Sequence, residues 1–185
     1  MSARIAPVSE PYDPATKDLL ERMMPSGPPI AMFTTLARNH GLAEAVHGLG
    51  AYQLNRDLSI SRREREIVID RTCALLRCEY EWGVHVAVFA AKARFDAEQI
   101  RSLAHGSSAD PCWTSDRERV LIDVVDALCR DHDLDDDLWD HAAKQFADAE
   151  LLDVVALTGW YHAVCFTARA FRLPFEPGTP RFAEV

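Results

Sequence analysis

Apolar residues recur with a spacing near 3.6 from about residue 15 onward, and alternating runs of strand length are nearly absent. The segment "LSISRREREIVIDRTCALL" opens with a Ser61-x-x-Glu64 capping box and then places its apolar residues along one helical face. The segment "AELLDVVALTGWYHAVCFTARAF" is apolar on almost every side, so we expect it to be central or buried at a subunit interface. This periodicity predicts an all-α fold.

The chain divides into one main domain and two short ends. Its 185 residues, of which 48% are hydrophobic, suffice for a single core. Residues 1–28 are predicted to form an N-terminal arm with a short helix that stops at "PSGPP". Residues 29–173 are the predicted helical domain. Residues 174–185 form a Pro-rich tail that we expect to lie along the surface or over a neighbouring subunit.

Charge and composition exclude several classes of partner. The net charge of -9 comes from acidic residues spread along the chain, and basic residues nowhere cluster with aromatics, so we expect no nucleic-acid partner. The N-terminus lacks an apolar segment, and no uninterrupted apolar run approaches the roughly 18 residues of a membrane span. The five cysteines have no CxxC spacing and suit a reducing compartment. These features predict a soluble, cytoplasmic protein.

The segment "ALLRCEYEWGVHVAVF" carries the residues that most suggest chemistry. A helix break is expected near Arg77, and Cys78, Glu81 and His85 then stand at i, i+3 and i+7, on one stripe of the next helix. If this stripe is buried, Glu81 can orient the imidazole of His85 and raise its pKa, which suits proton transfer to or from a carbon acid. On an exposed face the same pair would add little to stability and would not indicate a functional site.

Other residues have both a functional and a structural interpretation. Free backbone N–H groups at the helix start would stabilise a thiolate at Cys78, although the thiol can equally be inert and buried. Tyr80 and Trp82 flank the stripe and can shape a pocket for a flat organic ligand, and His162 can face the same pocket. All three are more often core residues. We expect no metal, unless Glu66, Glu81, His85 and His162 converge.

The segment "SISRREREIVIDRTCALLRCEYEWGVHV" resembles the carboxymuconolactone decarboxylase family, which includes the alkyl hydroperoxidase D (AhpD) proteins. The resemblance extends from about residue 31 to residue 172. It implies an AhpD-like helical bundle that assembles as a homo-oligomer, expected to be a trimer or a hexamer.

The two branches of the family match different residues of this chain. As in the hydroperoxidases, Glu66 stands twelve positions before Cys78, and His85 stands seven after it. Glu81 occupies the place of the second cysteine, so the resemblance does not support a dithiol peroxidase cycle. As in the decarboxylases, a glutamate lies four positions before the histidine. That branch implies cofactor-free decarboxylation, with His85 as the proton shuttle and Glu81 orienting it; Cys78 and Glu66 depart from its pattern.

Three hypotheses follow from these residues. The first is an enzyme with acid/base chemistry at Glu81 and His85, acting without a cofactor on a small organic acid or lactone. The second is a one-cysteine alkyl hydroperoxidase that uses Cys78, with Glu66 and His85 as a proton relay. The third is a non-catalytic oligomer that binds a ligand in the same cavity.

Overall fold

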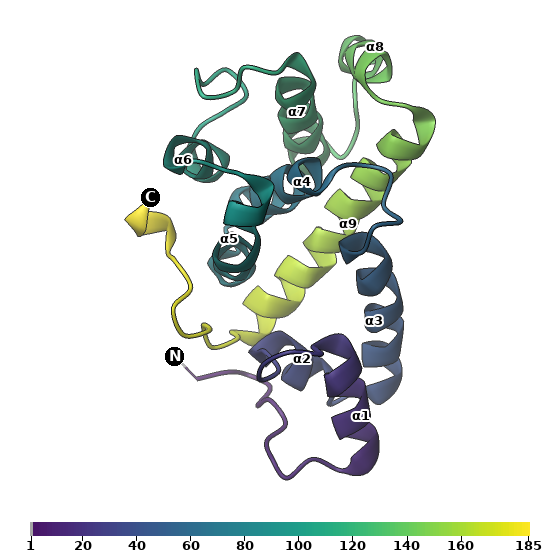
Figure 1. The fold of residues 1–185 in the computed structure, drawn as a ribbon, viewed down its shortest axis with the longest axis vertical. Coiled ribbons are helices and arrows are strands. Elements are labelled where there is room, and N and C mark those ends of the chain that lie inside the picture. Colours follow the sequence, from purple (N-terminus) through teal and green to yellow (C-terminus); the bar gives the residue numbers. More distant parts are fainter. Residues whose placement is uncertain (1) are drawn as a thin grey trace.

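The computed structural model describes residues 2–185, which form nine α-helices and one short 3-10 helix and contain no β-strand (Figure 1). The all-α prediction is confirmed. The helices are α1 (Pro14–Met23), α2 (Ala31–Leu36), α3 (His40–Leu54), α4 (Arg62–Leu75), α5 (Glu79–Ala93), α6 (Ala97–His105), α7 (Asp116–Arg130), α8 (Asp136–Gln145) and α9 (Asp148–Phe171), followed by η1 (Phe182–Glu184).

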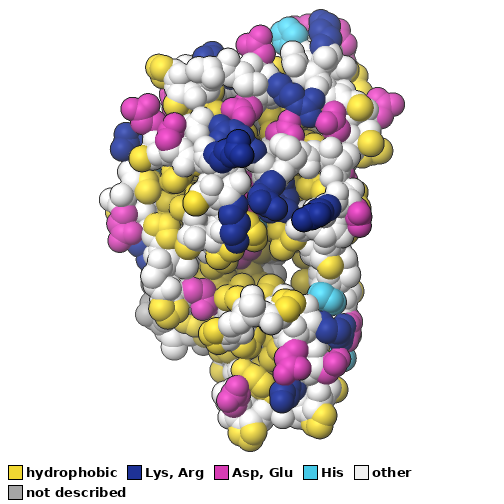
Figure 2. All heavy atoms as spheres, in the orientation of Figure 1, with side chains coloured by type: hydrophobic (Ala, Val, Ile, Leu, Met, Phe, Trp, Pro, Cys, Tyr) yellow, Lys and Arg dark blue, Asp and Glu magenta, His cyan; other side chains and the backbone are white. Residues whose placement is uncertain are grey.

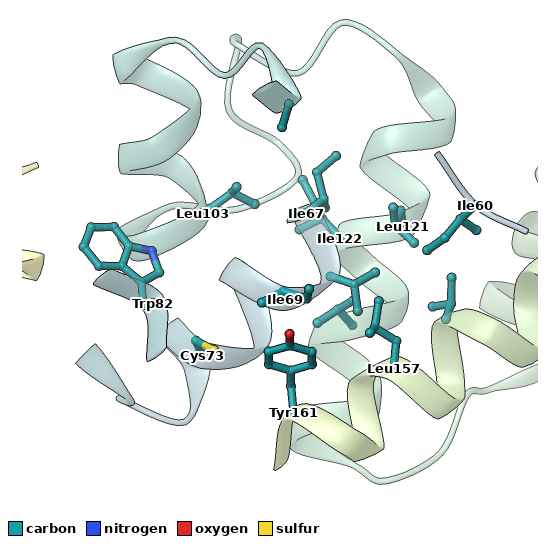
Figure 3. Close-up of a cluster of buried hydrophobic side chains, with 14 of the residues drawn as sticks. Ile60, Ile67, Ile69, Cys73, Trp82, Leu103, Leu121, Ile122, Leu157 and Tyr161 are labelled. Atoms are coloured by element: carbon teal, nitrogen blue, oxygen red, sulfur yellow. The ribbon is translucent and has the colours of Figure 1, made fainter. Parts of the chain in front are cut away.

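Helix α4 is the centre of the fold. It packs against α5, α6, α7 and α9, and every residue from Glu64 to Cys73 is buried. Its apolar side chains meet those of α7 and α9 in the main core, where Ile69 lies close to Leu157 and Tyr161 (Figure 3). Because no face of α4 is left to solvent, its charged residues must find partners inside the protein.

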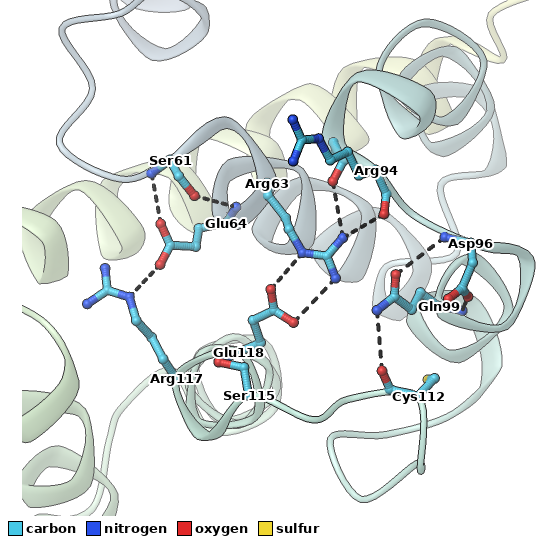
Figure 4. A network of polar contacts seen from close by, with 11 residues as sticks. Ser61, Arg63, Glu64, Arg94, Asp96, Gln99, Cys112, Ser115, Arg117 and Glu118 are labelled. Carbon is cyan, nitrogen blue, oxygen red and sulfur yellow. Dashed lines mark hydrogen bonds and ion pairs between the residues drawn. The ribbon is translucent and has the colours of Figure 1, made fainter.

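Polar contacts fix where α4 begins. The predicted capping box is present: the hydroxyl of Ser61 accepts from the Glu64 backbone N–H at 3.2 Å, and the Glu64 carboxylate accepts from the Ser61 N–H at 2.8 Å. The same carboxylate pairs with Arg117 of α7 at 2.5 Å (Figure 4). Arg63 reaches both Glu118 of α7 and the last carbonyls of α5. These contacts set the position of α4 relative to α5 and α7.

A tight reversal separates α4 from α5. Arg77 adopts a left-handed backbone conformation with φ 53°, and the backbone N–H of Cys78 donates to the carbonyl of Cys73 at 2.8 Å. Cys78 is the N-cap of α5. The break predicted near Arg77 is confirmed, and it places the stripe of Cys78, Glu81 and His85 directly against α4.

Helix α9 is the longest element and runs obliquely through the molecule, from beside α8 to near α2 (Figure 1). Its 24 residues are long and apolar enough to span a membrane by length and composition, although polar residues such as Asp153 and His162 interrupt the apolar run. The core helices of soluble proteins pass the same test, and 44% of its most apolar window is buried against the rest of the fold. Its other face is exposed: Leu152 is 71% and Phe166 62% accessible.

The C-terminal tail is laid along the outer side of α5. The ring of Phe182 lies 4.8 Å from that of Trp82, and the Phe182 N–H donates to the Glu79 carboxylate at 2.8 Å. Gly83 allows the close approach, because a Cβ at this position would lie 2.7 Å from the carbonyl oxygen of Pro180. The tail of this chain therefore covers its own helix α5.

Replacing Gly83 by Ala should loosen the tail. The new methyl group has to displace backbone, so we expect a loss of about 1–3 kcal/mol in the free energy of unfolding and faster tryptic cleavage after Arg181. Gly48→Ala in α3 is the matched control, because a Cβ there meets nothing within 4 Å. It should leave stability unchanged or raise it by up to about 1 kcal/mol. Urea unfolding measures both, and equal effects of the two substitutions would contradict this packing.

Candidate functional site

Three helices bring polar side chains to one buried point. Helix α4 supplies Glu66, α5 supplies Glu81 and His85, and α9 supplies Tyr161. Each of them is buried, and Glu81, at 7% accessible, is the most exposed of the four. The predicted stripe of α5 is therefore turned into the protein.

The imidazole of His85 has a partner on each nitrogen. Its Nδ1 lies 2.8 Å from the Oε2 of Glu66. Its Nε2 lies 3.0 Å from the hydroxyl of Tyr161 and 3.4 Å from the Oε1 of Glu81. A carboxylate on each side is satisfied best when both ring nitrogens carry protons, so the contacts favour an imidazolium.

The charges around His85 decide its protonation. Burial by itself lowers the pKa of His85, but the charge of Glu66 and the hydrogen bonds to Glu66 and Glu81 outweigh burial and raise this pKa to about 10. Burial raises the pKa of Glu66, whereas His85 and Arg65 lower it, and their effect is the larger. Arg65 donates to the second oxygen of Glu66 at 2.6 Å. Glu66 is therefore an ionised carboxylate shared by two cations.

Two further carboxyl groups next to this pair have unsatisfied oxygens. The Oε2 of Glu81 and the Oδ1 of Asp70 are buried and have no hydrogen-bond partner among the described residues. Burial and the nearby charge of Glu66 raise the pKa of Asp70 well above its usual range. A buried carboxylate oxygen without a donor is a place where a substrate hydroxyl or a proton can bind. Of these two residues, Glu81 belongs to the His85 cluster and is its most exposed member.

Cys78 is close to the cluster but is not activated. Its side chain is fully buried, and its sulfur lies 4.0 Å from the backbone carbonyl oxygen of Cys165. A hydrogen bond with Cys165 and burial both raise the pKa of the Cys78 thiol. Of the two sequence-based interpretations, the structure supports the buried thiol and not the thiolate stabilised by the helix start.

The predicted pocket residues do not meet His85. The hydroxyl of Tyr80 donates to Glu176 at 2.7 Å and accepts from the N–H of Met32, while Trp82 is covered by the tail. His162 donates from Nδ1 to the Thr158 carbonyl of its own helix, at 2.9 Å. The metal arrangement considered from sequence is not formed, since His162 does not join Glu66, Glu81 and His85, and residues 2–185 contain no group of three ligand side chains placed to hold a metal.

The sequence reasoning missed Tyr161. It identified the neighbouring His162, one position along the same helix. The buried positions of α9 would have indicated the right residue, because Leu157, Tyr161, Cys165 and Ala168 recur every three or four residues on one face. His162 falls just outside that face.

The cluster is closed to solvent in this structure. One surface hollow, of about 530 Å³, lies between α6 and the loop that follows it, and another lies beside the acidic residues of α7 and α8. Neither is lined by a member of the His85 cluster. Figure 2 shows a third hollow, rimmed by hydrophobic side chains, between the end of the molecule formed by α1–α3 and the remaining helices. A substrate needs local opening to reach His85.

Comparison with known proteins identifies the fold. Residues 41–122 match the carboxymuconolactone decarboxylase family, a shorter segment than the sequence resemblance suggested. A variant of the debrominase Bmp8 in complex with 2,3,4-tribromopyrrole is 14% identical, with a TM-score of 0.77 over 96% of this chain and 94% of that one. A peroxidase-related protein from Silicibacter sp. TM1040 is 17% identical, with a TM-score of 0.78 over 96% of each chain.

A third solved structure is a protein of unknown function from Agrobacterium tumefaciens, proposed to be the antioxidant defence protein AhpD. It is 19% identical, with a TM-score of 0.64 over 72% of this chain and 89% of that one. No curated protein sequence matches the chain. The three structures share the AhpD-like helical fold with this chain, and only Bmp8 among them is described by an established activity.

The raised pKa of His85 predicts how stability depends on pH. The folded state holds the proton up to about pH 10, whereas an ordinary histidine releases it near 6.5. The contribution of this proton to stability is fully present below pH 6.5 and is lost as the pH rises to about 10. Urea unfolding across this range should show a steeper fall for the native chain than for His85→Gln. Identical slopes would contradict the assignment of a protonated His85.

Proposed function

We propose, on the premise that the chain belongs to the carboxymuconolactone decarboxylase family over residues 41–122, that it is an enzyme in which His85 transfers a proton to a small organic substrate. The observation that carries this proposal is the buried imidazole of His85, with Glu66 on one nitrogen and both Tyr161 and Glu81 on the other. A buried histidine held between carboxylates is an arrangement typical of acid/base chemistry.

The geometry gives the two glutamates different roles from those expected. Glu66, at 2.8 Å, is the closer partner and holds Nδ1, so Glu66 rather than Glu81 orients the ring. The Nε2 proton then faces Glu81 and Tyr161, and this is the proton available for transfer. Glu81 has one unpaired oxygen and is placed to receive or return the proton. A His85 that is protonated at neutral pH begins the reaction as a proton donor.

A cofactor-free decarboxylation fits this donor. The bond between the substrate carbon and its carboxylate breaks, CO2 departs, and the electron pair stays on the substrate as an enolate. His85 gives its Nε2 proton to that enolate, and the hydroxyl of Tyr161 is placed to donate a hydrogen bond to its oxygen. We infer a small organic acid or lactone as the substrate. The debrominase Bmp8, which has this fold and binds 2,3,4-tribromopyrrole, supports a small, flat organic molecule as the ligand class.

Entry is proposed from the exposed side of α5. Glu81 is the most accessible member of the cluster, and Val88, two turns farther along the helix, is 45% exposed. A shift of the side chains between these two residues would open a path to Nε2 without breaking the contact between Glu66 and His85.

The second candidate is the one-cysteine hydroperoxidase, favoured by the likeness to a peroxidase-related protein and to a proposed AhpD protein. The register of Glu66, Cys78 and His85 suits it, but the buried thiol of Cys78 does not, because burial and hydrogen bonding raise its pKa. A non-catalytic, ligand-binding oligomer is the remaining alternative, and the closed cluster is the feature that favours it. We retain acid/base chemistry as the leading function.

We also propose that the chain assembles with copies of itself through the exposed face of α9. This face carries Leu152 and Phe166 at equal distances on either side of Gly159, with small residues between them, so two antiparallel copies would fit about a two-fold axis at Gly159. Such a contact can form part of the expected hexamer. Leu152→Glu should dissociate the assembly in light scattering, and Trp139→Glu on α8 should not; a monomeric native chain would contradict the proposal.

The cytoplasmic location stays a prediction. It agrees with the five cysteines, all of which are free thiols in the structure.

Replacing His85 by Gln should abolish turnover. We expect a loss of about 10²- to 10⁴-fold in kcat on whichever carboxylated lactone or β-keto acid proves to be a substrate, because the proton donor is removed. Glu66→Gln should retain weak activity and move its basic pH limb to lower pH, because His85 loses its closest carboxylate. His141→Gln, an exposed position on α8, is the control and should change nothing.

Cys78→Ser separates the two candidate enzymes. Under acid/base chemistry it keeps lactone or keto-acid turnover, since Cys78 makes no contact with His85. Under the hydroperoxidase alternative it removes peroxide consumption. Full turnover by His85→Gln would overturn the leading proposal.

A further inference from the structure

Three buried thiols meet beside the His85 cluster, and proton transfer uses none of them. They come from the end of α4 (Cys73), the start of α5 (Cys78) and the C-terminal half of α9 (Cys165), and each is fully buried. The sulfur atoms of Cys73 and Cys165 are 3.7 Å apart. The sulfur of Cys78 lies 4.0 Å from the backbone carbonyl oxygen of Cys165. Cys112 and Cys129 are only partly buried and do not join this group.

We propose that Cys73 and Cys165 are a redox-active pair that forms a disulfide between α4 and α9. A disulfide has a sulfur–sulfur length near 2.05 Å, so the two sulfurs need to approach by about 1.7 Å from their 3.7 Å separation. The two helices already pack against each other, and a change of side-chain rotamer with a small shift of α9 supplies this movement. No unfolding is required.

The oxidant is a small hydroperoxide, and the step balances in two parts. One sulfur attacks the distal oxygen of the hydroperoxide, the O–O bond breaks, and the alcohol leaves with the thiol proton, which gives a sulfenic acid. The second sulfur then attacks the sulfenic sulfur, the S–O bond breaks, and water leaves with the second thiol proton. The pair loses two electrons, and a dithiol reductant returns them. Burial raises the pKa of the Cys73 thiol to about 12, and the hydrogen bond with Cys73 together with burial raises the pKa of Cys165. Few thiolates form, as at Cys78, so the oxidation is slow and is not a peroxidase turnover. Only a small oxidant can reach so enclosed a pair.

The same two helices hold the partners of His85, so the disulfide acts on the cluster. Tyr161 lies one turn before Cys165 on α9, and Glu66 lies two turns before Cys73 on α4. Formation of the disulfide shifts α9 relative to α4. This shift occurs next to Tyr161, whose hydroxyl lies 3.0 Å from the Nε2 of His85. Oxidation should therefore change proton transfer at His85. The disulfide itself does not depend on the proposed function; only this coupling does.

Peptide mapping tests the pair directly, because trypsin separates all five cysteines. Cys73 falls in residues 72–77, Cys78 in residues 78–92 and Cys165 in residues 145–169. The reduced full-length protein is treated with one equivalent of hydrogen peroxide, its remaining thiols are alkylated, and its mass is measured before and after digestion. We expect the intact mass to fall by two hydrogen atoms, peptide 72–77 to be linked to peptide 145–169, and dithiothreitol to reverse the change.

Single-cysteine substitutions test which two thiols form the disulfide. Cys73→Ala and Cys165→Ala should each abolish the link, and Cys129→Ala, on α7, is the matched control that should keep it. Circular dichroism checks that each variant folds, and if one does not, the linkage map of the native chain decides alone. A link between peptides 78–92 and 145–169, or oxidation confined to Cys112 and Cys129, would overturn the proposal.

The effect of the disulfide on His85 is measured separately, by turnover. On oxidation, the turnover that depends on His85 should fall and recover with dithiothreitol in the native chain, but not change in Cys73→Ala. If the disulfide forms without any change in turnover, the proposed effect on His85 is overturned, whereas the proposal that Cys73 and Cys165 form a disulfide stands. A link in a protein without turnover on any substrate would count against the proposed function and not against the disulfide.

Discussion

The contact between Glu66 and His85 is the interaction on which the rest of the site depends. It joins the two helices that pack most extensively in the fold, α4 and α5, and both side chains are almost fully removed from water. Leaving either charge unpaired at this depth would cost several kcal/mol. Arg65, Tyr161 and Glu81 are the groups that complete the pairing, so the site and the centre of the fold are the same structure.

This dependence explains why the cluster is closed. The attraction between the protonated His85 and its two carboxylates is strongest where water does not screen the charges, and α9 covers the cluster with Tyr161. The reaction proposed here therefore needs an opening at the Glu81 side rather than a permanent pocket. The thiols behind the cluster belong to the same helices, and this shared position would let their redox state affect His85.

Local signals in the sequence predicted much of the fold. The capping box at Ser61, the break at Arg77 and the helical periods depend on neighbouring residues, and all three are present in the structure. The sequence also placed Glu81 and His85 on one helical stripe, and the structure buries that stripe. It did not show that Glu66 would hold the histidine more closely than Glu81, because that distance depends on how α4 packs against α5. Tyr161 was missed for the same reason, since it comes from a helix far along the chain.

The protonation state of His85 is the central claim, and ¹⁵N NMR of the imidazole tests it most directly. With the protein labelled at histidine, the Nδ1 and Nε2 shifts of His85, assigned with the His85→Gln variant, are followed from pH 6 to pH 11. We expect both nitrogens to keep their protons until about pH 10, well above the ordinary histidine value of 6.5. A neutral His85 at pH 7, with one unprotonated nitrogen, would contradict this account.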